Sequence, residues 1–150
     1  MKTPLKKEGF IQICIVVEDI EKAADKWAQL LNIPKPKVRD SHLEGNEDYT
    51  YRGKAVSCDL KVAVFDMGGF VIELHQPVGG ESTFQEFMEE HGNGVHHIGF
   101  ETGDKRDAII GELTEEGYGI RTVGYYPGSS WTIVDSEKDL GVNLNIKPVR

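Results

Sequence analysis

Four polar residues in strand-like runs are the candidates for chemistry. They comprise one imidazole, one carboxylate and two amides: Gln12, Glu73, His97 and Asn145. Imidazole nitrogen and carboxylate or amide oxygen are all competent ligands for a divalent first-row metal. A mixed nitrogen and oxygen set suits Zn, Ni, Co, Mn or Fe better than Ca. The sequence therefore predicts a metal centre whose identity it does not specify.

The spacing of these residues links them in pairs. His97 follows Gln12 by 85 positions (97 − 12), and the strand and helix pattern that starts at Gln12 starts again at His97. Asn145 follows Glu73 by 72 positions (145 − 73), near the ends of two matching apolar runs. Taken singly, each residue has a plainer interpretation as a satisfied or solvated polar side chain of a strand. A tandem duplication favours a shared site, because independent solvation has no reason to select equivalent positions.

Each copy of the repeat has the hydrophobic pattern of a strand, a helix and further strands. The expected strands are 10–17, about 49–52, 60–66, 70–76, 95–101, 120–123, 131–134 and 141–146, and the helices begin at Asp19 and near Lys105. The chain is expected to be a single α+β domain over 1–150. It contains two tandem βαβββ modules, about 9–76 and about 95–148, related by a pseudo-two-fold axis and joined by a linker and short helix over 77–94.

The segment 34–58 is polar and charged and has no clear periodicity. It accounts for the 13 residues (85 − 72) by which the first copy exceeds the second. A long loop beside a site is often a lid or specificity element, and a plain surface excursion is the alternative.

The composition limits the function classes. Hydrophobic residues make up 39% of the chain and charged residues 28%, as in an ordinary globular domain. The net charge of −8 argues against nonspecific binding to nucleic acid. No apolar run reaches membrane-spanning length and the N-terminus is charged, so we expect a cytoplasmic protein without membrane contact. The two cysteines, Cys14 and Cys58, form neither a disulfide framework nor a zinc spacing.

The remaining histidines have different expected roles. Strand parity places His96 on the face opposite His97, so His96 is expected to pack rather than to bind a ligand. His75 shares the face of Glu73 and is a further candidate for the same cavity. His42 and His91 have no partner that the sequence identifies.

Three stretches resemble the vicinal oxygen chelate superfamily, which includes glyoxalases, bleomycin resistance proteins and dioxygenases. They are residues 12–23, residues 72–77 with 94–101, and residues 140–146. The pattern is similar to glyoxalase I (lactoylglutathione lyase) and to methylmalonyl-CoA epimerase. The resemblance implies a cup-shaped sheet, a divalent metal held by Gln12, Glu73, His97 and Asn145, a small-molecule substrate and a homodimer.

The resemblance also implies a reaction. It is proton transfer next to a carbonyl through a metal-bound enediolate or enolate, carried out by a metal-dependent isomerase or lyase with Glu73 as the base. Asn145 departs from the glutamate that these enzymes usually carry, which leaves one candidate base. Epimerisation usually draws on groups at both faces of the carbon. A second group would have to come from the loop: Glu44, Glu47, Asp48 or Tyr49.

The alternative function is a noncatalytic binding protein of the bleomycin-resistance kind, in which the cup holds an aromatic or hydrophobic molecule. Such binding proteins generally lose all the metal ligands, whereas this chain keeps competent ones. An extradiol dioxygenase is disfavoured, because its iron site normally has two histidines and Gln12 replaces one of them.

Overall fold

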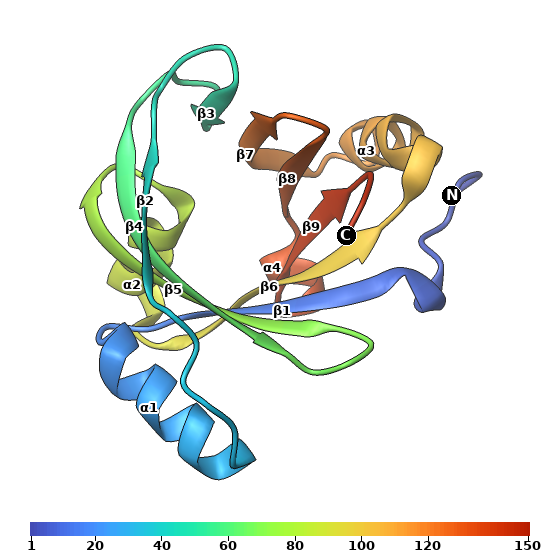
Figure 1. Cartoon of the computed structure of the whole chain (residues 1–150). Helices are drawn as coiled ribbons and strands as arrows, with labels where there is room; N and C mark the ends of the chain where they lie inside the picture. Colours follow the sequence, from blue (N-terminus) through green and yellow to red (C-terminus); the bar gives the residue numbers. More distant parts are fainter.

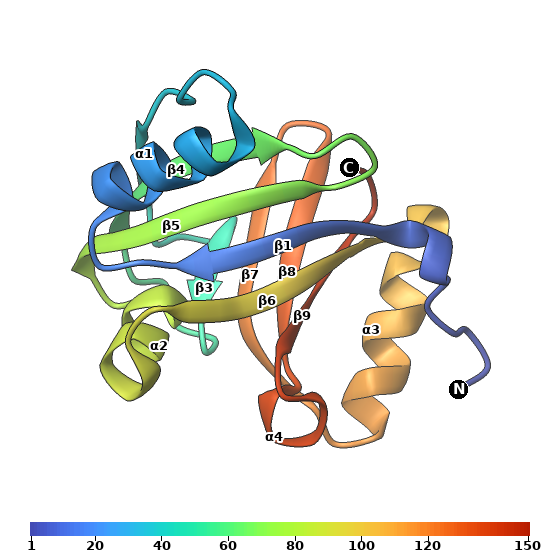
Figure 2. The same ribbon diagram turned by 90° about the horizontal axis from the view of Figure 1, so that it is seen from below.

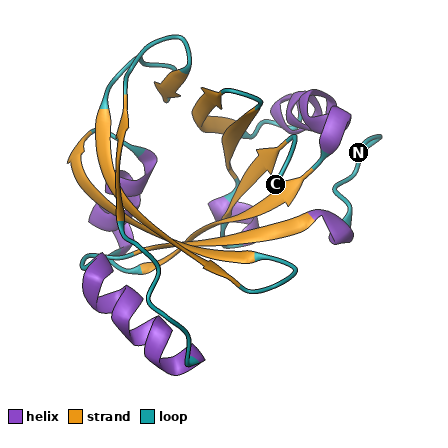
Figure 3. Ribbon diagram, in the orientation of Figure 1, coloured by secondary structure: helices purple, strands orange, loops and turns teal.

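The computed structural model, which describes residues 1–150, is a nine-stranded sheet curved into a cup, with its two longest helices packed on the outside (Figures 1 and 3). The first half contains β1 (Phe10–Val16), α1 (Ile20–Leu31), β2 (Arg39–Leu43), β4 (Cys58–Asp66) and β5 (Val71–Gly80). The second contains β6 (Gly94–Glu101), α3 (Arg106–Glu115), β7 (Gly119–Tyr126), β8 (Ser129–Asp135) and β9 (Asn143–Lys147). The other elements are β3 (Tyr49–Tyr51), α2 (Thr83–His91), α4 (Glu137–Leu140) and two short 3-10 helices, Lys7–Gly9 and Gly103–Lys105.

The strand order shows the internal symmetry. It is β2-β4-β5-β1-β6-β9-β8-β7-β3, so the two halves meet where β1 and β6 lie side by side (Figure 2). Apart from β3, the order on one side of this junction mirrors the order on the other. The expected α+β fold, with two βαβββ modules forming a cup-shaped, pseudo-two-fold sheet, is confirmed.

The first long helix has clear start and stop signals. The Asp19 carboxylate accepts a hydrogen bond from the backbone N–H of Lys22, which caps the N-terminus of α1. Asn32 ends the helix in the left-handed conformation with φ 54°. The buried stripe of α1 packs on outward-facing residues of β4 and β5, forming the cluster Val17, Ile20, Ala24, Ala28, Ala63, Phe65, Ile72 and Leu74. The outer face of the first half is therefore apolar and covered.

The second half buries its outer face in the same way. Ile109 and Leu113 of α3 pack on Val134, Leu144 and Ile146 of β8 and β9. Because successive residues of a strand point to opposite faces, covering the outer face leaves the alternate residues pointing into the cup. The polar candidates belong to this inner set.

The segment 34–58 contains two strands that divide between the halves. The first, β2, pairs with β4 at the edge of the first half. The second, β3, crosses the mouth of the cup and pairs with β7 of the second half (Figure 1). The short strand expected near 49–52 is therefore present, but it does not belong to the sheet of its own module. The strand that this module does contain at that place is β2, which was not predicted from the sequence. Its polar sequence, Arg39 to Leu43, lacks the alternation of apolar and polar residues that indicates a strand.

A second difference concerns the end of β5. This strand continues through Pro77–Gly80, where a linker was expected, and its last residue, Gly80, pairs with Cys58 of β4. A side chain at Gly80 would lie 2.2 Å from the carbonyl oxygen of Ser57, and its φ of 75° also favours glycine. Gly80 thus permits a close approach between β4 and β5 in a segment where the sequence predicts a linker.

None of the helices combines the length and apolar character that crossing a membrane requires.

Candidate active site

The two central strands bring the first pair of candidates together. β1 and β6 run antiparallel, with Gln12 paired to Gly99 and Cys14 paired to His97. Directly paired residues of antiparallel strands share one face of the sheet, so the Gln12 and His97 side chains both point into the cup. The two pairs are equivalent under the repeat offset. The pseudo-two-fold axis therefore passes between β1 and β6.

The flanking strands add the second pair. β5 and β9 run parallel to their neighbours, with Glu73 beside Cys14 and Asn145 beside Gly99. All four sequence-predicted residues line one cavity of about 550 Å³ at the floor of the cup. His75, the further candidate, lines the same cavity.

Three of the floor side chains form a continuous hydrogen-bonded chain. The Asn145 Nδ2 donates to Gln12 Oε1 over 3.2 Å, and the Gln12 Nε2 donates to Glu73 Oε2 over 2.6 Å. The Asn145 Oδ1 in turn accepts from the backbone N–H of Thr132 over 3.2 Å. His75 Nε2 contacts the other carboxylate oxygen of Glu73. The orientation of both amides is thereby determined by their partners.

The glycine at position 99 makes this chain possible. Gln12 lies on β1 and Asn145 on β9, with β6 between them. A Cβ atom at Gly99 would lie 2.7 Å from Gln12 Oε1 and 2.9 Å from Gln12 Cβ. Because Gly99 has no side chain, the Gln12 amide extends across β6 and reaches Asn145.

Glu73 is ionised at neutral pH. Burial by itself raises the pKa of this carboxyl, but the His75 imidazole, the Lys147 ammonium and the Gln12 amide together lower it below its usual value. The floor therefore carries a carboxylate held by two side-chain hydrogen bonds. A carboxylate in this state can accept a proton.

His97 presents a free ring nitrogen in this cavity. Its side chain is buried, and its Nε2 has no hydrogen-bond partner. Burial, together with the neighbouring His96, His75 and Lys147, disfavours a positive charge on His97 and holds its pKa well below the ordinary value. The ring is therefore a neutral imidazole.

A second histidine determines which His97 nitrogen carries the proton. The Nε2 of His96 lies 2.9 Å from the hydroxyl and 3.2 Å from the carbonyl oxygen of Thr83. The carbonyl can only accept, so the tautomer with a hydrogen on Nε2 is the one that satisfies both contacts. Burial lowers the pKa of His96 to about 3, and a neutral ring then leaves its Nδ1 as an acceptor. The Nδ1 of His97 lies 2.9 Å away and must donate. The Nε2 of His97 consequently keeps a lone pair, as a metal ligand requires.

The expected orientation of His96 is wrong. Strand parity placed it on the opposite face from His97, but the β1–β6 pairing shifts register between Cys14 and Ile15. This β-bulge lets consecutive residues of β6 keep their rings in contact. His96 does not line the cavity and supports His97 from the side of α2.

The segment between β2 and β4 contributes to the cavity. Asp48 and Tyr49 line it, whereas Glu44 and Glu47 do not. The carbonyl oxygen of Asp48 accepts a hydrogen bond from the backbone N–H of Tyr125 over 2.7 Å, which attaches this segment to β7. One of the loop carboxylates considered from the sequence thus reaches the candidate site.

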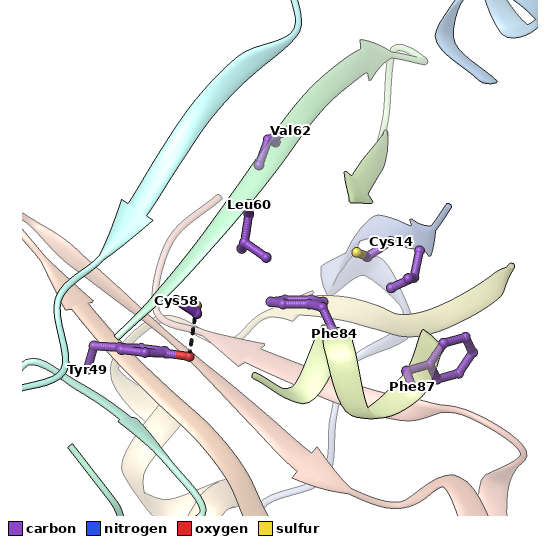
Figure 4. Close-up of a cluster of buried hydrophobic side chains, with 8 residues drawn as sticks. Cys14, Tyr49, Cys58, Leu60, Val62, Phe84 and Phe87 are labelled. Carbon is purple, nitrogen blue, oxygen red and sulfur yellow. Dashed lines mark hydrogen bonds between the residues drawn. The ribbon is translucent and has the colours of Figure 1, made fainter. Parts of the chain in front are cut away.

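An aromatic wall rises from the polar floor. Tyr49 stacks on Trp131 with ring centroids 6.1 Å apart, and the ring of Phe84 lies 6.3 Å from that of Trp131. The Tyr49 hydroxyl contacts the buried thiol of Cys58, and Phe84 projects from α2 into the same cluster (Figure 4). The sequence offered no signal for this wall, because β3 and α2 reach the cavity only through tertiary packing.

The other two histidines lie outside the cavity. His42 contacts Asp59 and Glu44 on the exposed edge of the first half, and His91 contacts Glu137. Both take part in ion-pair contacts at the surface.

A family model described as the glyoxalase/bleomycin resistance protein/dioxygenase superfamily matches residues 11–134. The chain belongs to this superfamily. The resemblance inferred from the strand motifs is thus confirmed. The curated proteins include no match to the chain.

Solved structures share the superfamily fold at low sequence identity. A hypothetical protein from Bacillus halodurans is 22% identical with a TM-score of 0.64, covering 92% of this chain and 91% of its own. Methylmalonyl-CoA epimerase from Mycobacterium tuberculosis is 18% identical with a TM-score of 0.59, covering 95% and 88%. A Streptomyces coelicolor methylmalonyl-CoA epimerase variant in complex with 2-nitronate-propionyl-CoA is 19% identical with a TM-score of 0.54, covering 96% and 97%.

Proposed function

We propose that this superfamily member is a metal-dependent isomerase or lyase of the glyoxalase I and methylmalonyl-CoA epimerase type. The reaction is proton transfer at a carbon next to a carbonyl. One observation carries the proposal: a neutral, unpartnered imidazole nitrogen and an ionised carboxylate lie in the floor of one cavity, at His97 and Glu73. Epimerases among the structural neighbours support the choice of reaction class.

The donor set fits a divalent ion. The Nε2 of His97 is free. The side-chain oxygens of Gln12 and Asn145 each accept one hydrogen bond, each carboxylate oxygen of Glu73 has one side-chain partner, and all of these oxygens keep lone-pair capacity. No group of three or more His, Cys, Asp and Glu side chains gathers in a metal-binding arrangement, so the two amides would complete the set. An ion held there would stabilise negative charge on a substrate oxygen.

The residues of the chain divide the remaining work. Glu73 accepts the proton from the carbon, and the Gln12 and His75 hydrogen bonds hold its carboxylate in position. His97 would hold the ion through the nitrogen that His96 leaves free. Asp48, at the opposite wall, is the candidate group for the second face of the carbon that an epimerisation requires.

A noncatalytic binding protein is the second candidate. The observation that favours it is the closed hydrogen-bond chain of the floor, in which both amides and the carboxylate already have partners. The polar groups of such a floor have hydrogen-bond partners without an ion. The aromatic wall would then supply the affinity for a ligand.

The deciding experiment combines metal analysis with proton exchange. Protein purified without chelators is analysed for bound metal, and solvent deuterium uptake at the substrate carbon is followed by NMR with methylmalonyl-CoA and with a dicarbonyl hemithioacetal. Glu73→Gln should slow exchange by about a hundred- to ten-thousandfold, the usual effect of losing a positioned base. His97→Ala should abolish metal binding, whereas His42→Ala, a surface control, should change neither quantity.

Asn145→Glu tests the same site in the opposite direction. A second carboxylate should tighten metal binding, because it adds a charged oxygen donor. Protein that takes up no metal, exchanges no proton and still binds a hydrophobic ligand regardless of Glu73→Gln would establish the binding-protein alternative.

Two further features belong to the proposal. We expect a homodimer, as the family resemblance implies, and a cytoplasmic location. Sedimentation velocity tests the first and fractionation of cells that produce the protein tests the second.

A further inference from the structure

The cavity contains two cations without carboxylate partners. Lys147 and Arg39 both line it. Neither is within ion-pair distance of any carboxylate of the chain. The protein has a net charge of −8, so acidic partners are plentiful elsewhere. These two cations are therefore available to an anion that comes from outside.

Lys147 is the better placed of the two. It lies two residues after Asn145 on β9 and points into the cup by strand parity. Its side chain is half-buried, and its Nζ lies 6.0 Å from the centre of the Tyr126 ring. It lines the same cavity as Asn145 and so lies beside the floor. Arg39 is more exposed and lies on the edge strand β2.

The neighbouring strand β8 presents a flat apolar surface beside Lys147, since Thr132 pairs with Ile146 and the next residues along the two strands are Trp131 and Lys147. Trp131 lines the cavity, and Tyr49 stacks on it with an angle of 28° between the rings. A side chain at Gly124 would lie 2.1 Å from the indole Nε1, so the glycine leaves the space that the indole occupies. Because these packing contacts orient Trp131, a planar ligand would meet a preformed surface.

We propose that the cavity binds a small planar acid, with its carboxylate on Lys147 and its unsaturated or aromatic body against Trp131. This inference rests on the proposed function only in placing the reacting carbon near Glu73. The cavity volume of about 550 Å³ suits a compact molecule. Asp48 lines the cavity without a cationic partner and would repel an acid bound in the reverse orientation.

The test measures binding without metal or turnover. Benzoate supplies a planar ring and a charge, benzyl alcohol the ring alone, and acetate the charge alone. The chain has only two tryptophans, so its ¹H–¹⁵N spectrum shows two indole signals, which Trp27→Phe assigns. Titrations are carried out in EDTA on wild type, Lys147→Met, Lys147→Gln, Lys147→Arg and Lys61→Met. Lys61 is a half-buried lysine of β4 outside the cavity and serves as the matched control.

Benzoate should shift the Trp131 signal saturably and leave the Trp27 signal unchanged. Loss of a charge-assisted hydrogen bond should weaken benzoate binding about ten- to a hundredfold in Lys147→Met and Lys147→Gln. Lys147→Arg and Lys61→Met should bind like wild type, and benzyl alcohol should not respond to any variant. Acetate should bind more weakly than benzoate.

Two results would overturn the inference. One is benzoate binding no tighter than benzyl alcohol, and the other is equal benzoate affinity in the two neutral Lys147 variants and in Lys61→Met. Two neutral variants, Lys147→Met and Lys147→Gln, are used so that the test can still be read if one of them fails to fold. Because no metal or proton transfer is involved, failure of the proposed catalysis leaves this result unaffected, and the reverse also holds.

Discussion

The Nδ1 atoms of His96 and His97 lie 2.9 Å apart, although these residues are neighbours on one strand. The bulge in β6 makes the contact possible, and the Thr83 carbonyl gives it a direction by holding the proton on His96 Nε2. The result is a lone pair on His97 Nε2 inside the cavity. His96 thus acts on the candidate site without touching it.

Replacing His96 tests this arrangement. His96→Phe removes the acceptor for His97 Nδ1–H, and loss of such an outer hydrogen bond to a metal-binding histidine typically weakens metal affinity about 10- to 100-fold. Thr83→Val is the comparison, because it removes the hydroxyl that lies 2.9 Å from His96 Nε2 but keeps the backbone carbonyl that accepts from this nitrogen. Titration calorimetry with Zn²⁺ or Co²⁺ should show a loss in the first variant and little change in the second. Equal affinities in both would show that His96 does not orient His97.

Gly99→Ala should disrupt the floor. The added methyl group would overlap Gln12 Cβ and Oε1, so Gln12 must move away from Asn145. Overpacking of this kind usually costs about 1–3 kcal/mol of stability. Urea unfolding measures this loss, and Gly69→Ala provides the comparison, since nothing lies within 4 Å of a Cβ at that hairpin position. Metal binding should weaken in Gly99→Ala alone.

The buried histidines predict that acid destabilises the protein. The folded-state pKa of His96 is lowered to about 3 by burial and by the charges of His75 and Arg121. Below the pKa of about 6.5 that this histidine has in the unfolded chain, the unfolded chain binds a proton that the folded chain excludes. The free energy of unfolding therefore decreases as the pH falls, by up to about 1.4 kcal/mol per pH unit. Urea unfolding in chelator between about pH 7 and pH 5 should show a shallower slope for His96→Phe.

The pKa of His42 is shifted in the opposite direction from that of His96, so His42 serves as a comparison. Hydrogen bonds to Glu44 and Asp59 raise its pKa, so any stability from its charge is present below the unfolded pKa and is lost as pH rises through the folded one. In His42→Ala, the protein should therefore still lose stability as the pH falls from about 7 to about 5. An unchanged slope in His96→Phe would contradict the assignment of that loss to His96.

Glu86 should hold β3 across the cup. Its carboxylate accepts hydrogen bonds from Tyr51 and Arg52 of the crossing segment and from the buried Arg121 of β7. Glu86→Gln should cost about 1–3 kcal/mol, because charged partners are left unsatisfied. Hydrogen exchange of the Tyr49–Tyr51 amides should accelerate as well. Glu89→Gln, on the exposed side of the same helix, should change neither measurement.

Asp48→Asn separates the two faces of the proposed reaction. If Asp48 serves the second face, the variant should lose epimerisation while keeping deuterium exchange catalysed by Glu73. The ratio of exchange to inversion at the substrate carbon measures this directly. Glu47→Gln, two positions from Tyr49 but outside the cavity, is the control. A proportional loss of exchange and inversion would assign Asp48 to binding.

The symmetric part of the molecule was predictable from the sequence. Gln12, Glu73, His97 and Asn145 stand at equivalent positions of a duplicated pattern, and strand parity then requires a common face. The first core helix, α1, was predictable because Asp19 and Asn32 mark the ends of an apolar stripe. The periodicity of apolar residues is enough to predict a helix or strand wherever one face of that element is buried.

The asymmetric part was not predictable in the same way. The polar strand β2 has no buried stripe of its own, and β3 is stabilised by its pairing with β7 and by Glu86, which is distant in sequence. The position of His96 depends on a bulge, which parity does not anticipate. In the sequence, Lys147 and Trp131 resemble ordinary strand residues, and only the folded structure shows that both line the cavity.

The placement of β3 also determines how the ends of the sheet meet solvent. An open sheet has two unpaired borders, and each is a template for pairing with another chain. Here β3 covers β7, so the border of the second half is closed by a strand of only three residues. The other border, β2, is short and carries Arg39, Asp40 and His42, charges that oppose the addition of a further strand. The segment 34–58, which has no clear periodicity, thus supplies both edge strands and protects the protein from edge-to-edge aggregation.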